Sequence, residues 1–167
     1  VFDAFFPGYG TSWPMMHGSI GMTYEQASVR GLVVRRSDET LLFFRDAIRH
    51  HFITSLSTAE MTARNRIDLL KYFYDFRVLA IEEVREEELK EYIIPAGRDS
   101  NRVAKLAALL LSQGVELRVS EEGFKNAKVS AASGEEVESR EFPPGTIVIS
   151  LSQPAKRLLR TLMDQHV

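Results

Sequence analysis

The sequence predicts an α/β protein in two parts, and three observations support that class. Apolar residues recur at steps of three and four over about residues 41–80, which is the spacing of one helix face. Strand-like and helix-like segments alternate over residues 92–167. Between them lies the charged run IEEVREEELKE, residues 81–91. We therefore expect a first part over residues 1–80, a solvated helix end or linker over 81–91, and a small α/β domain over 92–167.

The first part begins with a loop rich in glycine, proline and aromatic residues, FFPGYGTSWPMMHG, within residues 1–20. Its Pro-Gly and Trp-Pro pairs are turn signals, so we interpret it as an ordered loop that crosses a site or a groove. Residues 20–26 and 31–36 are predicted to be short strands. The helix over about 41–80 contains no Pro or Gly and would be roughly 60 Å long if unbroken. We therefore expect a bend or a break, near residues 55–58.

The second part has the order strand, helix, strand, strand, helix. The strand EYIIPAG leads to a helix that Asp99 or Ser100 can cap and that Gly114 ends. A strand over residues 115–120, a polar hairpin or excursion, and the buried strand GTIVISL follow, and Pro154 opens a last helix. The first crossover is expected to be parallel and right-handed.

Composition excludes several classes of protein. The 167 residues carry a formal net charge of −2, which argues against a general nucleic-acid binder. There is no cysteine, so a disulfide framework, a thiolate zinc site and a cysteine nucleophile are all excluded. No apolar run approaches the length of a membrane span. The chain starts with the apolar VFDAFF and no Met, and we expect it to be a fragment, so a missing signal peptide says nothing about export.

The histidines and glycine-rich loops give little support for a catalytic site. His50 and His51 are adjacent on the long helix and point about 100° apart, so they are expected to have a packing or surface role. His17 lies in the first loop and is the only histidine near a plausible site; a structural role is the favoured interpretation, and a contact with substrate is the alternative. The PAGRDS turn before the second-part helix can bind an anion at the helix N-terminus, but a capped turn is the simpler interpretation.

Glu25 stands out because it directly follows the apolar segment GSIGMTY at the end of a predicted strand. A carboxylate there is either a surface residue or a working acid. Composition and periodicity favour the surface residue, so any catalytic interpretation depends on the surrounding sequence.

The stretch YGTSWPMMHGSIGMTYEQA resembles the last part of the catalytic domain in bacterial zinc metallocarboxypeptidases of the carboxypeptidase A-like family. GLVVRR followed by LLFFRDAIRHHFITSL is similar to the strand and the long helix that close that domain. The stretches YIIPAGRD, ALLLSQGVELRVS and EFPPGTIVISLSQPAKRLLR resemble an accessory domain that some bacterial members carry. The resemblance implies the tail of a carboxypeptidase-like domain followed by a small three-layer, flavodoxin-like or glutamine amidotransferase-like α/β domain.

The resemblance also implies roles for four residues. Glu25 matches the glutamate that acts as general base on a zinc-bound water and then as general acid to the leaving amine. Tyr9 matches the loop tyrosine that closes over the substrate C-terminus. Trp13 and the residues around it, with His17 nearby, are expected near the pocket for the terminal side chain.

The family's zinc ligands are an HxxE pair and a later histidine, all upstream of the glutamate, and this sequence contains no HxxE. We expect no metal bound to this chain and no peptide cleavage by it alone. The resemblance implies zinc, a peptide or protein C-terminus as substrate, and export to the periplasm or medium only for the parent protein.

A second hypothesis is a non-enzymatic module, in which residues 90–167 bind a peptide, a glycan or another part of the parent and Glu25 is structural. Under either hypothesis the chain has open strand edges and uncovered apolar helix faces, so we expect it to self-associate through the long helix or residues 20–36.

Overall fold

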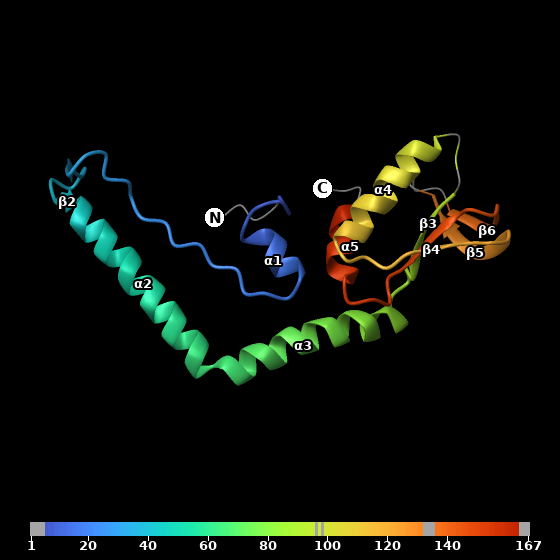
Figure 1. The fold of residues 1–167 in the computed structure, drawn as a ribbon, viewed down its shortest axis with the longest axis horizontal. Coiled ribbons are helices and arrows are strands. Elements are labelled where there is room, and N and C mark those ends of the chain that lie inside the picture. Colours follow the sequence, from blue (N-terminus) through green and yellow to red (C-terminus); the bar gives the residue numbers. More distant parts are fainter. Residues whose placement is uncertain (1–5, 96, 98, 132–135, 164–167) are drawn as a thin grey trace. The chain divides into compact units, whose positions relative to one another are not determined.

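The computed structural model describes residues 6–95, 97, 99–131 and 136–163. Along these residues the chain forms five α-helices, one 3₁₀-helix and three small antiparallel sheets (Figure 1). The mixed α/β class is therefore confirmed. The chain divides into two compact units: unit 1 holds Val1–Met15 and Ser19–Tyr74, and unit 2 holds Met16–Gly18 and Asp75–Val167. Of the helices described, none is long and apolar enough to cross a membrane.

Unit 1 contains a short hairpin and most of the helical sequence. Its elements are α1 (Ser12–Met16), β1 (Val33–Arg35), β2 (Leu41–Phe43), α2 (Phe44–Arg64) and the first half of α3 (Arg66–Glu82). The strand predicted over residues 31–36 is confirmed as β1, which pairs with β2. Asp38 closes the hairpin turn, because its Oδ1 accepts hydrogen bonds from the Thr40 amide and hydroxyl.

The first loop holds a one-turn helix that the turn signals did not predict. Pro14 lies in the first turn of α1, where its missing N–H costs nothing. The Trp13 amide donates to the Tyr9 carbonyl at 3.1 Å and so closes the turn that enters the helix.

The long helical sequence does break, but at Asn65 and not near residues 55–58. The hydroxyls of Thr54, Ser55 and Thr58 donate to carbonyls of the preceding turn, so these residues remain within α2. Asn65 instead leaves the helical conformation, and its amide and side-chain Nδ2 both donate to the Met61 carbonyl. The break therefore comes from a C-terminal cap formed by an asparagine.

The apolar stripe predicted for the long helix is present, and it is exposed. No residue of α2 is buried. Phe44, Ile48, Phe52 and Leu56 have between 47% and 62% of their surface exposed. The stripe, which we define by these four residues, is therefore unpacked within unit 1.

Unit 2 has a three-stranded sheet in the order β3-β7-β4, formed by Glu91–Ile94, Ile147–Ser150 and Arg118–Val119. Both outer strands pair antiparallel with β7. The strands β3 and β4 are therefore parallel to each other, as predicted for the first crossover, but they do not pair directly, and the described residues show no parallel flavodoxin-like sheet. The physical reason is that β7 lies between β3 and β4: it contains the buried Ile147 and Ile149 and takes the central position.

The other elements of unit 2 follow the sequence signals closely. Helix α4 (Ser100–Ser112) starts after Asp99, whose carboxylate accepts from the Arg102 amide at 3.0 Å. It ends before Gly114, which has φ +78°, the left-handed conformation typical of a helix C-terminus. The polar excursion is a hairpin of β5 (Phe124–Ser130) and β6 (Glu136–Phe142). Ala96 and Arg98 of the PAGRDS turn lie outside the described residues.

The core of unit 2 lies between the sheet and its helices. The last helix, α5 (Lys156–Met163), and the 3₁₀-helix η1 (Glu83–Arg85) both contribute to it. The apolar residues of this cluster are all less than a tenth exposed, and they are Val84, Leu110, Val115, Ile147, Ile149, Leu151, Ala155 and Leu159.

Candidate functional site

Glu25 lies in a segment that forms neither helix nor strand. Residues 19–29 belong to no ladder, so the strand predicted over residues 20–26 is wrong. In Figure 1 this segment runs as a stretched chain beside α2. A helix satisfies its own backbone and offers no ladder partner, which explains why the apolar alternation does not produce a strand here.

Two side chains fasten the segment to α2. The hydroxyls of Tyr24 and Thr58 are hydrogen-bonded at 3.0 Å. Nδ1 of His50 lies 2.9 Å from Oε1 of Gln26, and because this amide oxygen only accepts, the histidine nitrogen must donate. The predicted surface role of His50 therefore includes a specific contact with the segment that carries Glu25.

The same two contacts orient Glu25. Side chains of an extended chain alternate between opposite sides, so residues on either side of Glu25 point the same way and Glu25 points the other way. Tyr24 and Gln26 both point to α2, and Glu25 therefore points away from it. Its side chain is exposed, and among the described residues its carboxylate makes no hydrogen bond or ion pair.

Tyr9 and Trp13, the candidates for substrate contact, lie together at the entry to α1. They are joined by the backbone hydrogen bond that closes the turn, and both side chains are partly exposed. The Tyr9 ring packs edge to face on Phe6, with 5.3 Å between ring centres. Gly21, four residues before Glu25, passes close to α1, because a Cβ added there would lie 2.7 Å from the sulfur of Met15.

His17 belongs to unit 2, whereas the other three candidates belong to unit 1. Its carbonyl accepts a hydrogen bond from Arg77 Nη1 at 2.5 Å. Burial, and then the positive charge of Arg77, lower the pKa of the His17 imidazole below its usual 6.5. Both effects favour the neutral form of the ring.

Among the described residues there is no group of side chains that forms a metal centre, and a small recess lies in unit 2. No group of three or more histidine, aspartate or glutamate side chains within them could hold a metal ion. Glu116, Arg118, Ser152 and Gln153 help to line a small recess of about 170 Å³ in unit 2. Ligand pockets measure about 300–1,000 Å³, so this recess is small for a drug-sized ligand.

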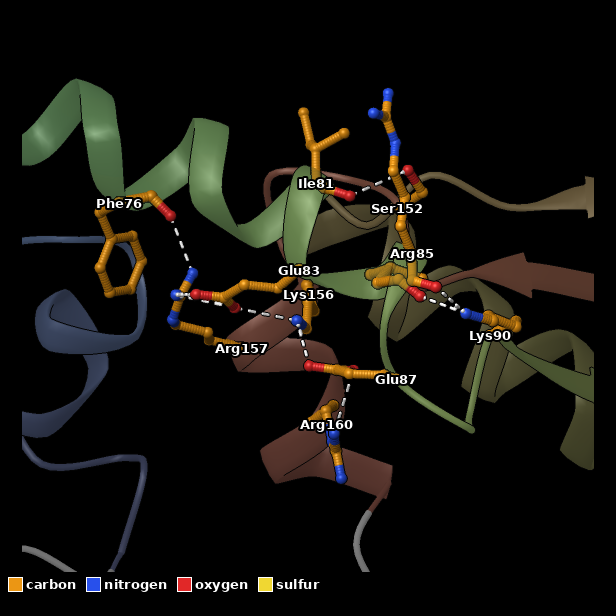
Figure 2. A network of polar contacts seen from close by, with 11 residues as sticks. Phe76, Ile81, Glu83, Arg85, Glu87, Lys90, Ser152, Lys156, Arg157 and Arg160 are labelled. Atoms are coloured by element: carbon orange, nitrogen blue, oxygen red, sulfur yellow. Dashed lines mark hydrogen bonds and ion pairs between the residues drawn. The ribbon is translucent and has the colours of Figure 1, made fainter.

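The sequence interpretation missed one cluster of charged residues (Figure 2). Lys156, whose side chain is only 3% exposed, lies 3.0 Å from Glu83 Oε2 and 2.5 Å from Glu87 Oε1. Arg157 pairs with Glu83 at 2.9 Å, and Arg160 with Glu87 at 3.3 Å. The run over residues 81–91, predicted to be a solvated helix end or linker, starts at the end of α3, and two of its glutamates form ion pairs with α5. The i, i+4 spacing of the two glutamates, matched by basic residues on the last helix, was the available signal.

Comparison with models of known families, with curated proteins and with solved structures gave no match for this chain.

Proposed function

We propose that the chain is the C-terminal portion of a bacterial zinc metallocarboxypeptidase, in which Glu25 is the general base. The observation that carries the proposal is the segment GSIGMTYEQA, with an exposed glutamate held on a tethered backbone. A general base must reach its proton from a defined position. The Tyr24 and Gln26 contacts with α2 supply such a position, because they restrain the residues on both sides of Glu25.

The proposed reaction is hydrolysis of the C-terminal peptide bond. Glu25 accepts a proton from the water that attacks the peptide carbonyl, and it then gives that proton to the leaving amine as the C–N bond breaks. An exposed carboxylate with no ion pair among the described residues is accessible for both transfers. Tyr9 closes over the substrate C-terminus, and Trp13 contributes to the pocket for the terminal side chain.

The described residues do not fit a zinc site, since they contain no group of ligands that could hold the ion. The proposal assigns the zinc ligands and the groups that bind the substrate carboxylate to another part of the parent protein, which we propose is exported. The 167-residue chain alone is expected to be inactive.

The test compares two variants of the full-length parent, purified with zinc and assayed for release of C-terminal amino acids from peptides. Glu25→Gln should lower kcat by about 10²- to 10⁴-fold, the usual contribution of a general base. Glu60→Gln is the matched control, because it removes the same charge from an exposed residue of α2, and it should keep the parental rate. A Glu25→Gln enzyme with parental kcat, or a parent that releases no amino acid, would contradict the proposal.

A further inference from the structure

Three residues of the first loop belong to unit 2 and not to unit 1. Met16, His17 and Gly18 fall in the compact unit otherwise formed by residues 75–167. The chain reaches this turn from the segment with Tyr9 and Trp13, and it leaves the turn towards Glu25. We call these three residues the 16–18 turn.

Side chains of α3 and α5 contact every residue of the 16–18 turn. Arg77 of α3 donates to the His17 carbonyl at 2.5 Å. Thr161 of α5 places its hydroxyl 3.6 Å from the Met16 sulfur. At Gly18 a Cβ would lie 2.9 Å from Cδ1 of Phe76. The backbone of the turn is therefore in direct contact with the Phe76 ring.

Gly18 is adapted to this contact in two independent ways. Its φ of +93° is a conformation that other residues rarely adopt. The position also lacks room for a side chain, because the nearest atom of Phe76 is closer than a real Cβ contact allows. Glycine is the residue that allows a backbone to approach a neighbouring group this closely, so the contact with the Phe76 ring indicates specific packing of the turn.

Arg157 of α5 holds Phe76 in place (Figure 2). Its guanidinium lies 4.4 Å from the centre of the Phe76 ring, and its Nη1 donates to the Phe76 carbonyl at 2.8 Å. Its Nη2 donates to both carboxylate oxygens of Glu83, at 2.9 and 3.1 Å. The planar guanidinium of Arg157 therefore stacks on the Phe76 ring, donates to the Phe76 carbonyl and forms an ion pair with Glu83 of η1. Lysine cannot reproduce this combination.

We propose that Arg157 and Phe76 are positioning residues, which seat the 16–18 turn and so define where the chain segments carrying Tyr9, Trp13 and Glu25 begin. The catalytic part of this inference rests on the proposed carboxypeptidase function. The two residues then act as a clamp on the 16–18 turn, which lies between Trp13 and Glu25 in the sequence. Misplacement of reacting groups by about 1 Å can lower a rate by about 100-fold. Residues that do not touch the substrate can therefore still affect kcat by positioning the residues that do.

The first test measures amide hydrogen exchange in the 167-residue chain. Arg157→Ala should speed exchange of the amides of residues 16–22 by about tenfold, because Phe76, which contacts Gly18, loses the cation–π contact and the charged hydrogen bond that Arg157 provides. Arg160→Ala is the matched control: it removes the same side chain from the same helix, but Arg160 pairs with Glu87. Unchanged exchange in Arg157→Ala, or an equal rise in Arg160→Ala, would overturn the clamp.

Two further measurements keep the result interpretable. Exchange of the β7 amides reports whether unit 2 remains folded, and if Arg157→Ala unfolds it, Arg157→Lys retains the charge while losing the planar stacking. In the full-length parent with zinc, Arg157→Lys should lower kcat by about tenfold with little change in KM or in zinc content. Parental kcat in an active parent overturns the positioning role. A parent without activity refutes the proposed function and the catalytic part of the inference, whereas faster exchange would still establish the clamp.

Discussion

Lys156 provides the sharpest prediction about the stability of unit 2. Its ammonium is almost fully enclosed, with a side-chain exposure of 3%, and it meets two carboxylates. The partners are far more exposed, with 42% for Glu83 and 28% for Glu87. The energetic cost of breaking the pairs therefore differs among the three groups. The two carboxylates can be solvated by water when they lose Lys156, but the buried ammonium cannot be solvated when it loses the carboxylates.

This asymmetry predicts different costs for the two ways of breaking the cluster. In Glu83→Gln/Glu87→Gln the ammonium stays buried without an anion, and the free energy of unfolding should fall by about 3 kcal/mol, near the lower limit for an uncompensated buried charge because glutamine keeps an acceptor oxygen. Lys156→Met preserves the volume of the side chain and leaves two partly solvated carboxylates that retain their arginines. Its cost should stay below about 1.5 kcal/mol.

The assay is amide exchange of β7, the central strand of unit 2, which exchanges only when the unit opens. A loss of about 3 kcal/mol speeds exchange by roughly 10²-fold, since about 1.4 kcal/mol is a factor of ten. Glu86→Gln/Glu88→Gln removes the same charge from exposed positions in the same run and should leave β7 exchange nearly unchanged. If Lys156→Met destabilises unit 2 as much as the double glutamine variant, the argument from the buried ammonium is wrong.

Three further predictions follow from other features. The hydrogen bond from Lys156 is the main cause that lowers the pKa of Glu87 below its usual 4.5. The ionised Glu87 therefore stabilises the folded state fully above about pH 4.5, and this stabilisation is lost as the pH falls through the lowered pKa of the folded state. Urea unfolding midpoints measured from about pH 6 to 2.5 should show the loss, and the loss should be smaller in Lys156→Met. Asp99→Ala should cost about 1 kcal/mol through the lost cap of α4, measured by thermal unfolding, and a cost near zero would argue against capping. The exposed stripe on α2 should make the chain self-associate at tens of micromolar in light scattering, and Phe52→Ser should weaken this; a monomeric chain would contradict the expectation.

Local signals in the sequence predicted the local parts of unit 2 well. Asp99 and Gly114 bound α4 because a cap needs only the few residues around it. The polar excursion forms the expected hairpin for the same reason. These features depend on short-range hydrogen bonds, so one stretch of sequence contains all of the participants.

Features that depend on distant residues were not predictable in this way. The alternation of apolar residues in β7 does not indicate that this strand lies between β3 and β4. Strand order depends on which strand buries its apolar residues most completely, and that depends on distant parts of the chain. The charged run over residues 81–91 has the composition of a solvated segment. Its glutamates bind α5 because Lys156 and Arg157, about seventy positions later, lie against it.

The orientation of Glu25 illustrates the same division between local pattern and distant partner. The motif identifies a carboxylate, but its direction follows from two residues of α2 that bind its neighbours. His50 and Thr58 are eight positions apart, so at about 100° per residue they share one side of the helix, and Phe52 lies about 160° from their midpoint. Helix α2 therefore uses its polar side to hold the Glu25 segment and leaves its apolar stripe on the opposite side. Because the segment binds the polar side, it cannot cover the stripe, and whatever does cover that stripe can pack on α2 without displacing Glu25 from its tether.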